Sequence, residues 1–282
     1  MVSKIDGNHV LYHYLEKDLK EADIWLFQML AARLFTDLGI WLSPGVYSRC
    51  PILLPFAVRD PTCRPRKSGD IDQWGAPNAS GYFRDDNSLI KSIPRSLTIR
   101  GSANSIYHGH RLGNGFVASH VWRVCATTTD RSELSSRDPD TYSFVPNLVW
   151  LPVQVAKLTD REGSFAQTYL QALSYKIYHS VTVAQGFRSA VKRAWEKLGA
   201  PSGIPESGLA DPKDLAYFEE SEEFVQRRIG TIKTVAAAID DVAAGRKLRT
   251  KIISTRYTKG LLVLSLNEVL GLHKALQEFI TA

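Results

Sequence analysis

The chain has 282 residues, of which 44% are hydrophobic and 23% charged, values that exclude disorder throughout the chain and a fibrous repeat. Its 35 lysines and arginines against 29 aspartates and glutamates give a net charge of +6, which is compatible with a polyanionic partner. With three scattered cysteines, no apolar run of about 18 residues and no secretory leader, the sequence predicts a cytoplasmic protein that neither spans a membrane nor depends on disulfides.

The first predicted region, residues 1–104, combines a helix with a proline-rich segment. Apolar residues at spacings of three and four predict a helix over residues 9–42, with Gly39 as a stop signal. From about residue 43 to 118, prolines and glycines favour short strands and long loops, which we expect to carry recognition. Within this segment, the acids at 85 and 86 and Lys91 lack the spacing of a D…(D/E)-x-K nuclease motif, and we interpret them as a turn before a recognition loop.

The second predicted region, residues 105–198, is expected to form the catalytic core. Residues 116–126 are rich in β-branched and aromatic side chains and predict a strand. A turn at Asp138-Pro139-Asp140 precedes extended chain from Tyr142 to Trp150. Helices are expected at 151–178, with a break near Gly163, and at 183–198.

The third predicted region, residues 209–282, follows a Ser/Gly/Pro-rich linker at 199–208 and is mostly helical. Helices are expected at 214–244 and 266–280, with a strand pair at Lys251–Tyr257 and Leu261–Ser265. Residues 246–259, here called the basic strip, contain six cations and no acid, and we interpret Arg249, Lys251 and Arg256 as nucleic-acid contacts. The alternative interpretation is an ordinary solvated surface.

A histidine and an asparagine mark the most informative part of the chain. From Gly113 onward the sequence indicates a strand that ends in Ala118-Ser119-His120, and Asn147 opens the segment Asn-Leu-Val-Trp-Leu-Pro 27 positions after His120, ahead of a predicted helix. This arrangement resembles the HNH, or ββα-metal, endonuclease superfamily, over about 50 of the 282 residues. The resemblance implies that His120 activates water and that Asn147 belongs to the catalytic motif.

The two usual metal-ligand positions of that family carry other residues here. Ser119 precedes the histidine, and Ala156 lies nine residues after the asparagine. Three alternatives remain open: Asn147 alone holds a mostly hydrated Mg²⁺ (or Mn²⁺), Asp160 reaches back from one helical turn beyond Ala156 as a second ligand, or the metal site is degenerate.

Elementary chemistry supports the same residue types. Phosphodiester hydrolysis needs a base that acts near pH 7, which histidine supplies, and positive charge on the phosphate, which Mg²⁺ with oxygen ligands supplies. Arg123 and Lys157 are the expected phosphate-neutralising cations, and Lys157 is counted with the catalytic residues. The structural alternatives are a packed core histidine at 120 and a helix-capping role for Asn147.

Together these observations predict an α+β fold, in which an HNH-like core is embedded in a larger domain with flanking helices. The predicted function is that of a Mg²⁺-dependent, sequence-specific DNA endonuclease of the restriction type, acting on double-stranded DNA as a homodimer. The rival interpretation is a DNA-binding or modified-base-reading protein whose HNH-like core no longer cuts.

Overall fold

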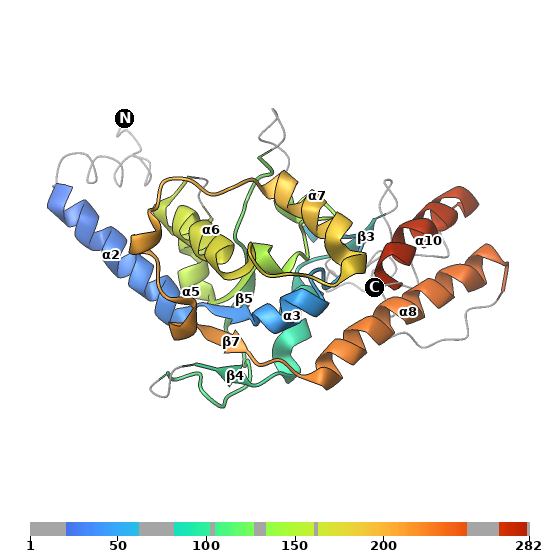
Figure 1. The fold of residues 1–282 in the computed structure, drawn as a ribbon, viewed down its shortest axis with the longest axis horizontal. Coiled ribbons are helices and arrows are strands. Elements are labelled where there is room, and N and C mark those ends of the chain that lie inside the picture. The colour runs from blue at the N-terminus through green and yellow to red at the C-terminus, as the bar shows by residue number, and fades with distance from the viewer. Residues whose placement is uncertain are drawn as a thin grey trace, which may run out of the picture.

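The computed structural model describes residues 21–61, 82–101, 105–126, 134–160, 163–246 and 265–280 (Figure 1). The fold is α+β, as predicted, with helices arranged around a five-stranded sheet and a separate pair of strands. The start of the predicted helix 9–42, the strand Lys251–Tyr257 and all but the last residue of Leu261–Ser265 lie outside the described residues. No described helix combines the length and the hydropathy that a membrane span needs.

The five-stranded sheet draws on all three predicted regions of the chain. Its order is β4 (Ile99–Arg100), β7 (Ala216–Phe218), β1 (Ile40–Leu42), β6 (Leu148–Pro152) and β5 (Phe116–His120). β1 runs parallel to β7, and the other neighbours are antiparallel. β6 lies inside the sheet, and its first four residues are all buried, which fits a continuous apolar strand rather than an alternating one. The second sheet pairs β2 (Ala57–Arg59) with β3 (Phe83–Asp85).

The described helices begin and end at residues with clear local reasons. They are α2 (Glu21–Leu38), α3 (Pro44–Arg49), α4 (Ser88–Ser92), α5 (Val153–Ala156), α6 (Phe165–Tyr178), α7 (Arg188–Leu198), α8 (Glu222–Ala243) and α10 (Leu266–Ile280). The hydroxyls of Ser43, Ser164 and Ser221 accept backbone N–H groups at the starts of α3, α6 and α8. Gly199 ends α7 at a φ of 72°, a left-handed conformation that glycine adopts without strain.

Several predicted boundaries are wrong, and each error has the same origin. The predicted helix 9–42 ends at Leu38, and residues 40–42 form β1. Residues 151 and 152, predicted as the start of a helix, are the last residues of β6, and the helical chain begins at Val153 with α5 and resumes after Gly163 as α6. The helix expected from residue 214 starts at Glu222, after β7. In each case a short apolar segment is a strand because distant strands pair with it, and local periodicity cannot show such pairing.

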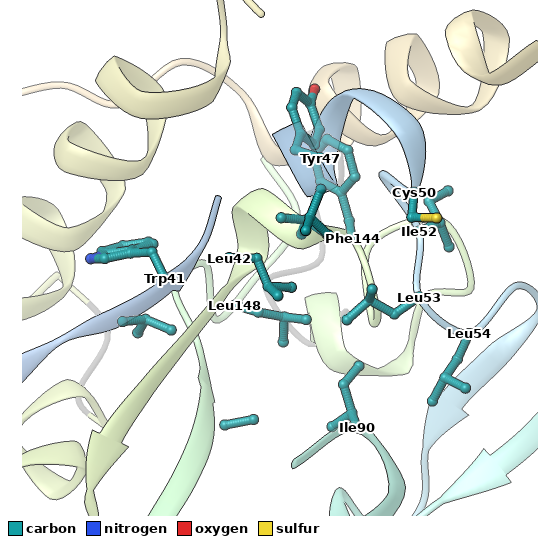
Figure 2. Close-up of a cluster of buried hydrophobic side chains, with 14 of the residues drawn as sticks. Trp41, Leu42, Tyr47, Cys50, Ile52, Leu53, Leu54, Ile90, Phe144 and Leu148 are labelled. Carbon is teal, nitrogen blue, oxygen red and sulfur yellow. The ribbon is translucent and has the colours of Figure 1, made fainter. Parts of the chain in front are cut away.

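Part of the hydrophobic core lies around β1 and β6. Figure 2 shows Leu42 of β1 and Leu148 of β6 in the same cluster as Tyr47 and Phe144, and all four are essentially inaccessible to solvent. The rings of Tyr47 and Phe144 meet edge to face, with centroids 5.9 Å apart. This core fixes the position of β6, and therefore the position of the strand paired with it, β5.

Candidate functional site

His120 and Asn147 lie at the same end of the antiparallel strand pair formed by β5 and β6. β5 and β6 pair antiparallel from Phe116 opposite Pro152 to His120 opposite Leu148. Asn147 comes immediately before β6, and α5 follows β6 directly. The chain therefore runs strand, long connection, strand, helix, with His120 at the end of the first strand.

A backbone carbonyl orients the ring of His120. The Nε2 atom lies 3.0 Å from the carbonyl oxygen of Tyr142, and the two rings stack with centroids 5.4 Å apart. Because a carbonyl only accepts, Nε2 carries the proton and Nδ1 keeps a lone pair. Burial lowers the pKa of His120 to about 4, and the positive charge of Arg59 acts in the same direction, against the opposing hydrogen bond. His120 is therefore neutral at pH 7.

A buried carboxylate in turn holds Tyr142. The Tyr142 hydroxyl donates to Oδ2 of Asp85 at 2.7 Å, and Asp85 also accepts the backbone N–H groups of Leu89 and Ile90 at the start of α4. Burial raises the pKa of Asp85, while the hydrogen bond from Tyr142 opposes that rise. The residues Asp85, Tyr142 and His120 thus form a continuous chain of polar and stacking contacts.

His120 lies on the wall of a cleft of about 440 Å³ that is rich in cations. Arg59 comes from β2, Arg123 follows β5, and Lys157 follows α5. All three side chains are exposed, and no salt bridge within the described residues involves any of them. The other polar residues of the cleft are Asn87, Ser119, Ser136, Thr159 and Asp160. Three positive charges against one carboxylate make the cleft suited to an anion.

The structure brings together most of the described residues that the sequence singled out. His120, Arg123, Lys157 and Asp160 all line this cleft, and Arg123 donates to the backbone carbonyl of Asp160. The predicted nucleic-acid contacts Arg249, Lys251 and Arg256 lie outside the described residues.

Asn147 is placed differently from the prediction. Its side chain is completely buried, with Oδ1 accepting the backbone N–H of Trp122 at 2.8 Å. Its Nδ2 donates to Oγ of Ser135 at 3.1 Å and to the carbonyl of Thr141 at 2.9 Å. These three hydrogen bonds hold the connection between β5 and β6, and Asn147 does not line the cleft, so the geometry favours a structural role for Asn147 over the predicted roles as catalytic residue and Mg²⁺ ligand.

Sequence reasoning missed three residues of the site. Arg59 belongs to the proline-rich region, where the sequence indicated recognition loops but no single residue. Asp85 and Tyr142 lie 35 and 22 positions from His120 in the chain and carry no motif. The sequence predicts only a turn at Asp85, which is the last residue of β3 and precedes α4.

Few of the described side chains are placed to ligate a divalent cation. Among them, no group of three or more histidine, cysteine, aspartate or glutamate side chains is placed to hold a metal. The carboxylate that lines the cleft is Asp160, which is exposed. Mg²⁺ commonly keeps several waters and binds through one or two carboxylates and substrate phosphates, so this set fits a hydrated Mg²⁺ held jointly with a substrate but not a closed protein site.

Comparisons of the chain with protein-family models, with curated proteins and with solved structures found no match. The functional argument therefore depends on the geometry around His120.

Proposed function

We propose that the protein hydrolyses phosphodiester bonds of double-stranded DNA, with His120 as the general base. The observation that carries the proposal is a neutral histidine, with its Nδ1 lone pair uncommitted, on the wall of a cleft that three cations surround. A base at this position accepts a proton from water, and cations beside it stabilise charge that builds on phosphate.

The residues in and around the cleft have separate roles in the proposed reaction. The Tyr142 carbonyl holds Nε2 and fixes the tautomer, so the attacking water loses its proton to Nδ1 of His120 as its oxygen bonds to phosphorus. The bond from phosphorus to the leaving sugar oxygen breaks, and that oxygen takes a proton from solvent. Arg59, Arg123 and Lys157 bind the non-bridging phosphate oxygens and stabilise the extra negative charge of the transition state. Asn147 positions these groups only indirectly, through the connection that it holds.

The order of elements favours an HNH-like ββα core for residues 105–198. In support, His120 ends one strand, the next strand pairs with it, and a helix follows. If Mg²⁺ takes part, Asp160 would hold it together with the substrate, and the ion would supply positive charge beside the scissile phosphate. Restriction-type sequence specificity, action as a homodimer and phosphate contacts from the basic strip belong to the same proposal.

A second candidate is a DNA-binding or modified-base-reading protein that does not cut. The observation in its favour is the absence of a clustered ligand set for a metal among the described residues. The cationic cleft would then bind a phosphate without hydrolysing it.

One experiment separates the two candidates. Purified protein is incubated with supercoiled plasmid in Mg²⁺, in Mn²⁺ and in EDTA, and both cleavage and gel retardation are scored. The proposal expects discrete linear fragments that depend on the metal, whereas retardation without cutting would favour the binding protein.

The variant His120→Ala should lower the cleavage rate at least about a hundredfold and leave DNA affinity within a few-fold of wild type. His110→Ala is the matched control, because His110 is exposed and does not line the cleft. Cleavage by His120→Ala within a few-fold of wild type would contradict the assignment of the base.

A further inference from the structure

Phe56 has a backbone conformation that is unusual for a bulky side chain. Its φ is 58°, in the left-handed region, where the Cβ atom of an L-residue is crowded. The residue lies directly before β2, the strand that ends at Arg59. Strained residues persist only where the surrounding structure holds them, and they cluster at functional sites. The contacts that hold Phe56 therefore bear on the cleft that Arg59 lines.

The last turn of α10 packs on Phe56. The rings of Phe56 and Phe279 meet edge to face, with centroids 5.9 Å apart. The ring of Phe279 also packs on that of Phe187, with centroids 5.7 Å apart, and Phe279 is only 6% exposed. Figure 1 shows the C-terminal end of α10 directed toward the rest of the fold. Phe279 therefore joins the turn at residue 56 to the segment that precedes α7.

Further contacts anchor α10 to the protein. Nε2 of His273 lies 2.8 Å from Oδ1 of Asp240 in α8. Three apolar side chains at helical spacing are buried, namely Val269, Leu272 and Leu276. These contacts hold the position of α10 against α8.

The turn at Phe56 leads into the small sheet that supplies two groups to the site. The Phe56 carbonyl accepts the N–H of Phe83 at 2.8 Å, where β2 begins to pair with β3. β2 ends at Arg59, on the wall of the cleft, and β3 ends at Asp85, which holds Tyr142. Arg59 is exposed and has no salt bridge among the described residues, so the backbone of β2 sets where its side chain begins. A change of direction at Phe56 would therefore move Arg59.

We propose that Phe279 is a positioning residue for the cleft: it holds Phe56 in the left-handed conformation, and β2 then directs Arg59 toward the bound phosphate. The identity of the anion rests on the proposed function, whereas the contacts among the three residues do not. Without the ring of Phe279, Phe56 is expected to relax to a negative φ, which any bulky residue prefers. The cleft would then lose one of its three cations.

The rival explanation is that Phe279 only stabilises the core. Both explanations predict that Phe279→Ala is less stable than wild type, because a buried ring is lost. They differ in whether the effect of Phe279→Ala on the cleft depends on Arg59.

A double-mutant cycle separates the two explanations. The affinity for a short fluorescent DNA duplex is measured in EDTA for wild type, Phe279→Ala, Arg59→Gln and the double variant. Each single change should weaken binding several-fold and reduce the slope of log K against log salt by about 0.9, the value for one lost phosphate contact. The double variant should equal Arg59→Gln, whereas two effects that multiply would overturn the proposal.

A matched pair of variants at position 56 tests the backbone directly. Phe56→Gly and Phe56→Ala both remove the ring, but only glycine adopts a positive φ without strain. Phe56→Gly should therefore keep an affinity close to that of wild type, whereas Phe56→Ala should bind as weakly as Arg59→Gln. Equal affinities of the two variants, whether high or low, would refute the proposal. Because Phe279 stays in place, this pair decides the question even if Phe279→Ala does not fold.

A measurement without DNA keeps the test separate from the proposed function. Burial is the main cause of the low pKa of His120, and the charge of Arg59 adds to it. Phe279→Ala and Phe56→Ala should therefore increase the fraction of His120 that is protonated at pH 5, followed by NMR of its ring carbons. In the Arg59→Gln background, neither change should increase this fraction further.

The two readouts distinguish the possible failures. A wild type that binds no DNA, with the expected NMR result, would refute the nuclease function and support the positioning role of Phe279. An unchanged His120 signal in both Phe279→Ala and Phe56→Ala would rule out the positioning role, whatever the protein does to DNA.

Discussion

Replacing Asn147 separates a structural role from a metal-binding one. Asn147→Ala removes one hydrogen bond to the Trp122 N–H and two to Ser135 and Thr141, all in a fully buried position. The Trp122 N–H is then left without its partner, which costs about 1–3 kcal/mol. The lost donors and the small cavity bring the expected loss in the free energy of unfolding to about 3–5 kcal/mol.

The assay is urea and thermal unfolding in EDTA, where no metal contributes. At about 2–4 °C per kcal/mol for a chain of this size, the melting temperature should fall by roughly 6–20 °C. Asn114→Ala is the matched control, because Asn114 is exposed in the turn before β5, and it should change the stability by less than about 0.5 kcal/mol.

Asn147→Asp sharpens the test, because it keeps the oxygens that a metal would need and removes both donors. The structure predicts clear destabilisation, since a carboxylate would face the Thr141 carbonyl without a proton between them. A metal ligand would instead tolerate the change or bind Mg²⁺ more tightly. Wild-type stability of Asn147→Ala in EDTA, with weaker stabilisation by Mg²⁺, would refute the structural role.

Two further predictions concern charge. The pKa of His120, about 4, lies below its value of about 6.5 in an unfolded chain, so unfolding takes up a proton between these pH values and stability falls as the pH drops from 6.5 to 4. In His120→Gln, this loss of stability at low pH should be smaller by up to about 3 kcal/mol. The measurement is urea unfolding of both proteins at pH 7.5 and 4.5, and an equal loss of stability in the two proteins would contradict the prediction. Exchanging Arg249 and Lys251 together for Gln should reduce the slope of log K against log salt for DNA binding by roughly one to two. An unchanged slope would support the alternative interpretation, in which the basic strip is an ordinary solvated surface.

The elements that the sequence predicted well have strong local signals. Gly39 and Gly199 both lie where a helix ends, and the break expected near Gly163 separates α5 from α6. The strand that ends at His120 has five of the eleven predicted residues, and its apolar, β-branched composition identified it. The last helix, 266–280, was predicted with the observed limits.

The elements that the sequence missed depend on distant partners. Residues 40–42 continue an apolar helical pattern, but they form a central strand because β6 and β7 pair with them from more than 100 positions away. The position of Asn147 in the hairpin followed from the motif, whereas its role followed from Trp122, Ser135 and Thr141, whose approach no spacing reveals. Local sequence patterns therefore identified the strand pair, but they could not show which contacts its side chains make.

The low pKa of His120 limits its strength as the general base of the proposed reaction. A histidine with a pKa of about 4 is a weak base, because burial and Arg59 both oppose the charge it would acquire. A phosphodiester bound among Arg59, Arg123 and Lys157 would offset that positive field and raise the pKa of His120 toward the working pH. Bound substrate would therefore make His120 a stronger base. Without substrate, His120 would be too weak a base to deprotonate water.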